Sequence, residues 1–158
     1  MKSLKIIFAG SLCNIEVHPN KNALQQRDVV ATNLAESPFW KRVNSDYGTR
    51  QVIFEVKNYK DLGFTEYRQL HSYLCKDYGA LAFFVTRAAN NNLEKGKELN
   101  WARELKSEHQ KVVIKLSVKF IEKHLKKLRN PQKHDALDKD LNALLDTYVR
   151  KYFPVQCK

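Results

Sequence analysis

The chain has 158 residues, a length that suits one domain with its own hydrophobic core. Its 28 Lys and Arg against 17 Asp and Glu give a formal net charge of +11, which favours an acidic partner such as nucleic acid. Hydrophobic residues make up 43% of the chain, and Gly and Pro are few, which excludes disordered, collagen-like and low-complexity proteins.

Cysteine spacing and apolar segments indicate the compartment. The three cysteines lie far apart without a C-x-x-C pair, so neither a disulfide framework nor a zinc site is expected. The apolar run 6–9 is too short for a signal segment, and no run approaches the roughly 18 apolar residues of a membrane span. We therefore expect a cytoplasmic protein that does not enter the membrane.

The first third of the chain is expected to form a β-hairpin and a helix. Residues 6–17 and 26–32 are rich in β-branched and apolar types, and turn-forming residues occupy 19–22 between them. Ser37, followed by a proline, is typical of a helix start, and that short helix should end near Gly48.

The rest of the chain alternates between strand and helix patterns. Without a visible linker or repeat, residues 1–158 are predicted to be one mixed α/β domain, with a core over about 10–116 and C-terminal helices over 117–153. The expected strands cover 51–57, 80–86 and 112–116, and the expected helices cover 65–77, 93–107, 117–128 and 135–152.

An acidic-x-Lys triplet occurs twice, about as often as chance predicts for this composition. Glu104–Lys106 falls in an expected exposed helix, where a solvated surface is the better interpretation. Glu55 and Lys57 fall instead on a strand whose alternate residues Val52, Phe54 and Val56 are apolar, and they share its other face. A charged pair on such a strand is costly unless it is paired or functional.

Hydrolysis of a phosphodiester suggests how such a pair would act. Mg²⁺ binds oxygen ligands, usually one or two carboxylates with waters and substrate phosphate. Asp28, on the expected second hairpin strand, is the candidate partner of Glu55, and the carbonyl of Val56 could add a third oxygen. Lys57 could orient or deprotonate the attacking water, or offset charge in the transition state.

The order Asp28 … Glu55-x-Lys57, on a hairpin strand and the following strand, resembles the PD-(D/E)xK nucleases. The resemblance implies a restriction-endonuclease-like α/β fold, a mixed β-sheet flanked by helices. It also implies that Asp28 and Glu55 ligate Mg²⁺, for which Mn²⁺ would substitute, and that Lys57 serves catalysis.

Two further segments extend the resemblance, which covers about residues 10–116. The spacing of Gln69 and Tyr73 on the next helix matches the Q-h-x-x-Y signature of RecB-like members. A strand that ends in Arg87 is similar to those of bacterial restriction-type domains. The resemblance implies that Gln69 and Tyr73 support the site or the substrate.

The chain departs from the family pattern at two points. Arg27, not proline, precedes Asp28. Many members carry another acid on a helix before the hairpin, but no helix is expected there, and the upstream acid Glu16 falls on the first strand. Two explanations stay open: the chain is a domain of a larger protein, or its site is built without that ligand.

The sequence therefore predicts a Mg²⁺-dependent deoxyribonuclease, an endonuclease of a prokaryotic restriction or defence system. One alternative is a catalytically inactive nucleic-acid-binding module on the same fold. Another is an interaction domain in which Glu55 and Lys57 form an ordinary surface ion pair. DNA is the expected partner; the choice between DNA and RNA, endo or exo cleavage, a homodimer, and a fused or partner sensor domain all stay open.

Overall fold

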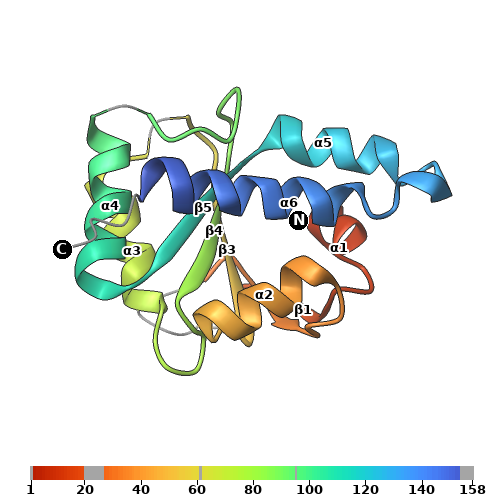
Figure 1. Cartoon of the computed structure of the whole chain (residues 1–158), viewed down its shortest axis with the longest axis horizontal. Coiled ribbons are helices and arrows are strands. Elements are labelled where there is room, and N and C mark those ends of the chain that lie inside the picture. Colours follow the sequence, from red (N-terminus) through yellow and green to blue (C-terminus); the bar gives the residue numbers. More distant parts are fainter. Residues whose placement is uncertain (1, 20–26, 61, 95, 154–158) are drawn as a thin grey trace.

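A five-stranded mixed sheet forms the centre of the protein (Figure 1). The computed structural model describes residues 2–19, 27–60, 62–94 and 96–153. The strands follow their chain order. β2 pairs antiparallel with β1 and with β3, whereas β4 pairs parallel with β3 and with β5, which confirms the α/β class. The strands are β1 (Leu12–Val17), β2 (Val29–Asn33), β3 (Gln51–Lys57), β4 (Leu81–Thr86) and β5 (Val112–Ser117).

Helices flank this sheet. In the view of Figure 1, α2 and α6 lie in front of the strands and contact each other, and α5 contacts both α1 and α6. The helices α3 and α4 form a separate pair. Among the described residues no helix is long and apolar enough to cross a membrane. The helices are α1 (Lys2–Ile7), α2 (Pro38–Tyr47), α3 (Phe64–Tyr73), α4 (Lys97–His109), α5 (Val118–Lys127), α6 (Ala136–Thr147) and a terminal π-helical turn, η2 (Tyr148–Tyr152).

Strand β4 connects the two halves of the hydrophobic core. Successive side chains of a strand point to opposite faces. On one face, the ring of Phe83 lies 6.0 Å from that of Trp40, which is in contact with Phe8. On the other, the ring of Phe84 lies 5.3 Å from that of Tyr67 on α3. The uninterrupted apolar run of β4 thus reflects burial on both sides, as expected for a central parallel strand.

The N-terminus of α2 is capped from a distant helix. The helix begins after Ser37 and ends before Gly48, whose φ of 58° lies in the left-handed region, as the sequence predicts. Asp138 of α6 accepts a hydrogen bond from the Phe39 backbone N–H at 3.1 Å and another from the Ser37 hydroxyl. Its negative charge therefore stabilises the start of α2 as well as its own helix.

The prediction for the N-terminal residues was wrong. Residues 2–7 form α1, and the first strand begins only at Leu12. Leu4, Ile7 and Phe8 are buried at helical spacing, so packing against the core stabilises a helix too short to persist alone. A helix does precede the hairpin, but it contains no acidic residue. The expected turn after β1 falls mostly outside the described residues.

His124 is a buried titratable group between α5 and α6. It is 1% exposed, packs against Phe120 and lies 3.1 Å from Asp140. Burial lowers the pKa of His124 and the charges of Lys127 and Lys123 lower it further, which outweighs the opposing effect of Asp140. The folded protein therefore binds this proton more weakly than the unfolded chain does.

We expect the free energy of unfolding to fall between about pH 7 and pH 5, because the stability that His124 contributes exists above its unfolded pKa of about 6.5 and is lost as pH falls through the folded value. His124→Gln should flatten this dependence, since glutamine does not titrate. Urea unfolding across this pH range measures the slope, with exposed His134→Gln as the control. Equal slopes for His124→Gln and the unmodified protein would contradict the assignment.

Candidate active site

The five side chains singled out from the sequence meet in one cleft. Strand β3 and helix α3 form much of its lining, and its volume is about 940 Å³. The structure therefore brings these residues together, and their catalytic roles stay predictions. The residues that line the cleft are Asp28, Glu55, Val56, Lys57, Phe64, Thr65, Arg68, Gln69, Ser72 and Tyr73.

Antiparallel pairing brings Asp28 to this cleft. Val29 of β2 pairs with Phe54 of β3, so Asp28 lies beside the C-terminal half of β3. One carboxylate oxygen of Asp28 accepts a hydrogen bond from the Val56 backbone N–H at 2.8 Å. The other lies 3.9 Å from Nδ1 of His18, a residue that the sequence did not connect with the site.

Glu55 is buried on the face of β3 that it shares with Ile53. Ile53 and Glu55 on that face are 0% and 2% exposed. Glu55 Oε1 accepts a hydrogen bond from Lys57 Nζ at 2.9 Å, whereas buried Oε2 has no hydrogen-bond partner among the described residues. Burial raises the pKa of Glu55 and the negative charge of Asp28 adds to the rise, whereas Lys57 and, more weakly, the backbone of Asp28 lower it. A buried carboxylate oxygen without a partner is costly.

A chain of hydrogen bonds leads from Glu55 into α3. Lys57 Nζ donates to Glu55 and, at 3.2 Å, to Oε1 of Gln69. Gln69 Nε2 donates to the hydroxyl oxygen of buried Tyr73 at 2.7 Å. Because Gln69 and Tyr73 are four residues apart on α3, they share one face of that helix. Gln69 thus contacts Lys57 directly, and Tyr73 supports Gln69.

Lys57 is held in its charged form. Burial opposes the charge, but the hydrogen bond and the negative charge of Glu55 outweigh burial and raise the pKa of Lys57. A general base works best with a pKa near the operating pH, so a lysine with a raised pKa is poorly suited to that task. Of the roles expected for Lys57, offsetting negative charge fits the geometry better than deprotonating water.

Asp28 and Glu55 are the cleft residues that could hold a hard divalent cation. Both line the cleft, and buried Oε2 of Glu55 has no hydrogen-bond partner among the described residues. Among the described residues, no group of three or more His, Cys, Asp or Glu is arranged to hold a metal. A site here would thus consist of two carboxylates with the Val56 carbonyl, waters and substrate oxygens, which suits Mg²⁺ better than zinc.

Some residues at the cleft were missed, and one candidate lies outside it. Phe64, Thr65, Arg68 and Ser72 line the cleft beside Gln69 and Tyr73. Helical periodicity around Gln69 is the sequence signal that points to Thr65 and Ser72. The upstream acid Glu16 is exposed on β1, paired with Val30, and is not among the cleft residues.

Gln69→Ala should slow DNA cleavage by about 10–100-fold, the usual cost of losing a group that orients a metal-site residue. Lys57 would lose one of its two acceptors, while the melting temperature should change little because Gln69 is only half-buried. Tyr73→Phe should have a smaller effect, since it leaves the contact between Gln69 and Lys57 intact.

Single-turnover cleavage rates and thermal melts measure these effects, with exposed Gln132→Ala as the matched control. An unchanged cleavage rate in Gln69→Ala would remove Gln69 from the site.

The chain is related to a much longer protein. It is 47% identical over 156 residues to an Escherichia coli (strain K12) protein named "Putative transposon gamma-delta 80.3 kDa protein". The match covers 99% of this chain and 22% of the relative, so the chain spans about a fifth of the length of the curated relative it matches. No family model matches the chain, and no solved structure matches it. The name of the relative connects it with a transposon and states no chemical activity.

Proposed function

We propose that this protein is a Mg²⁺-dependent deoxyribonuclease that hydrolyses phosphodiester bonds at the cleft between β3 and α3. The observation that carries the proposal is the buried, unpartnered Oε2 of Glu55 in a cleft that it shares with Asp28 and Lys57. A domain that needed only stability would gain by replacing such a group. The proposal includes the finer fold assignment, a restriction-endonuclease-like domain.

In the proposed reaction, water adds to phosphorus, one P–O ester bond breaks, and a proton passes to the leaving oxygen. A bound Mg²⁺ would supply Lewis-acid activation and charge neutralisation. Asp28 and Glu55 would hold the ion, and the ammonium of Lys57 would stabilise the negative charge that develops on the phosphate oxygens. Gln69 and Tyr73 would fix the position of that ammonium.

Incubation of the purified protein with supercoiled plasmid and Mg²⁺ or Mn²⁺ tests this function. We expect nicked or linear DNA that forms only with the metal and that a chelator prevents. Gel shifts with the same DNA identify the alternatives. Binding without cleavage would indicate a catalytically inactive nucleic-acid-binding module, whereas neither binding nor cleavage would indicate an interaction domain.

The relation to a transposon protein agrees with a role on DNA. It agrees equally with a restriction or defence function, a function in DNA transfer and a binding role. We propose a defence function, in which a sensor domain would belong to the part of the longer protein outside this chain. Cleavage of plasmids that differ only in base modification would test the defence function. Equal rates on modified and unmodified DNA would show that this domain does not distinguish the two kinds of DNA.

A further inference from the structure

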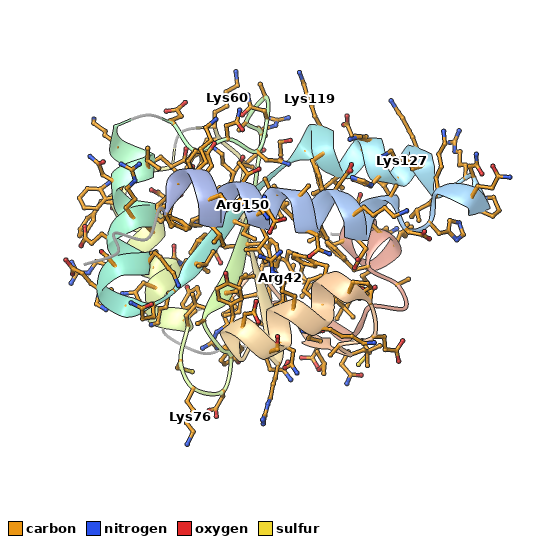
Figure 2. The ribbon with its side chains drawn as sticks, in the orientation of Figure 1. Arg42, Lys60, Lys76, Lys119, Lys127 and Arg150 are labelled. Carbon is orange, nitrogen blue, oxygen red and sulfur yellow. The ribbon has the colours of Figure 1, made fainter. Side chains whose placement is uncertain are left out.

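The net positive charge does not by itself identify a surface for DNA. Figure 2 shows the labelled basic side chains projecting in several directions, with Lys60 and Lys119 at one edge and Lys76 at the opposite one. Others are neutralised: Arg42 lies 2.7 Å from Asp146, and Lys127 interacts with an acid of α6. A cation that meets the substrate should instead be unpaired and adjacent to the proposed reaction site.

Arg68 meets both conditions. It is exposed on α3, lines the same cleft as Glu55 and Lys57, and forms no ion pair with a carboxylate in the described part of the chain. The charged residues of the cleft lining are Asp28, Glu55, Lys57 and Arg68. Lys57 is paired with Glu55, whereas Arg68 is a lining cation without a carboxylate partner among the described residues.

A pair of aromatic rings supports Arg68. Its guanidinium carbon lies 5.8 Å from the ring centre of Phe64, which is within the range of a cation–π interaction. The ring of Phe64 lies 4.6 Å from that of Trp101 on α4. Phe64 remains 45% exposed despite this contact, so the ring pair lies at the surface of the protein. The arrangement restricts Arg68 before any ligand binds, which lowers the entropic cost of binding.

We propose that Arg68 binds a phosphate of the DNA strand held in the cleft, distinct from the phosphate that is attacked. The proposal rests on the nuclease function proposed above. Lys57 and the two carboxylates occupy the reaction site. Within the described part of the chain, no hydrogen bond or ion pair joins Arg68 to any of them, and Arg68 is exposed on α3. A guanidinium binds phosphate through two parallel hydrogen bonds, which suits it to fixing the register of a strand.

Equilibrium binding of a fluorescent DNA duplex tests the proposal, with Glu55→Gln as the background so that the duplex is not cut. Adding Arg68→Gln should weaken binding about tenfold, the loss expected for a hydrogen bond to a charged group. Between about 50 and 200 mM salt, the slope of the logarithm of the DNA association constant against the logarithm of the salt concentration should become less steep by about 0.9. This change corresponds to the loss of one phosphate contact. Arg68→Lys should retain the slope and part of the affinity.

Arg129→Gln is the matched control, because it removes the same charge from an exposed position in the turn after α5, which is at the end of the molecule away from α3 (Figure 1). It should leave both the affinity and the salt slope nearly unchanged. In the otherwise unmodified protein, Arg68→Gln should raise KM more than it lowers kcat, since its contact with DNA precedes the reaction.

The two proposals fail in different ways. If the unmodified protein cuts DNA while Arg68→Gln keeps the salt slope, affinity and KM of its parent, the assignment of Arg68 is wrong and the nuclease function stands. If the protein binds DNA without cutting it and Arg68→Gln still reduces the slope, the nuclease function is wrong and the phosphate contact stands. Absence of DNA binding would overturn both.

Discussion

Replacing Glu55 by glutamine is expected to lower the rate of Mg²⁺-dependent DNA cleavage more than about 100-fold, beyond the usual cost of losing a residue that only supports a metal ligand. The substitution exchanges one carboxylate oxygen for an amide nitrogen that cannot bind a cation. DNA binding should stay the same or become tighter, because one negative charge facing the phosphates disappears. Parallel cleavage and gel-shift assays separate the two effects.

The second acidic-x-Lys triplet provides the matched control. Glu104→Gln changes the same residue type in the same local pattern, but on an exposed position of α4. It should leave cleavage unaffected. Full activity in Glu55→Gln would show that the hydrolytic site lies elsewhere, and equal losses in both variants would point to a general effect on folding.

The proposed binding of a metal by Glu55 can also be tested without DNA. Mg²⁺ should raise the melting temperature of the unmodified protein and not that of Glu55→Gln, since an ion that binds only the folded state stabilises it. Because burial raises the pKa of Glu55, the proton competes with the metal at a higher pH than at an exposed glutamate. The stabilisation by Mg²⁺ should thus decrease as pH falls toward that raised value. A shift of equal size in Glu55→Gln would place the ion elsewhere.

Local sequence patterns predicted most of the secondary structure. The bounds of β3 agree with the prediction, because its alternating β-branched and aromatic residues are typical of a strand. The helix predicted over 117–128 corresponds to α5, which Ser117 caps because its hydroxyl accepts the Phe120 backbone N–H. The N-terminal prediction failed because Ile6 and Ile7 favour a strand in isolation, whereas helix α1 is selected by the packing of Leu4 and Phe8 against the core.

The central part of the candidate site followed from the order of its residues along the chain. Glu55 and Lys57 share one face of β3, as the period of a strand predicts, whereas Gln69 and Tyr73 were singled out by their resemblance to the Q-h-x-x-Y signature. His18 beside Asp28 was not predictable, because that contact depends on how β1 and β2 pair. Arg68 was not predictable either, since its proposed role depends on α3 forming one wall of the cleft and on the contact between Phe64 and Trp101 of α4.

A second buried Lys–Glu pair had no local signal at all. Lys115 lies on β5 and is 2% exposed. Its amine donates to Glu98 on α4 at 2.7 Å, across 17 positions of sequence. Glu98 also accepts from the Glu94 backbone N–H at 2.8 Å and from the Tyr67 hydroxyl at 3.4 Å. Its carboxylate therefore has a partner on each oxygen.

Lys115→Met is expected to lower the free energy of unfolding by about 3–5 kcal/mol. Methionine preserves much of the volume of lysine, so the main change is that the carboxylate of Glu98 stays buried without its positive partner. Adding Glu98→Gln should recover a large part of the loss, because glutamine is neutral and still accepts one of the remaining hydrogen bonds. Urea unfolding followed by tryptophan fluorescence measures both variants.

Lys123→Met is the control, since it removes an exposed lysine from an ion pair with Asp140 and should cost no more than about 1 kcal/mol. A similar small loss in Lys115→Met would mean that Glu98 reaches solvent or takes up a proton at little cost.

The register of the parallel strands places the two buried pairs on the same face of the sheet. Glu55 pairs with Phe84, and Phe84 pairs with Lys115, so the two charged residues flank one aromatic ring. The pair formed by Lys115 and Glu98 is fully satisfied, and its loss should affect folding while leaving the chemistry of the cleft unchanged in whatever folded protein remains. The pair formed by Glu55 and Lys57 leaves one carboxylate oxygen unused beside the cleft. Glu55→Gln should therefore abolish cleavage while the protein stays folded. Lys115→Met should lower the free energy of unfolding, while the molecules that remain folded still cleave DNA.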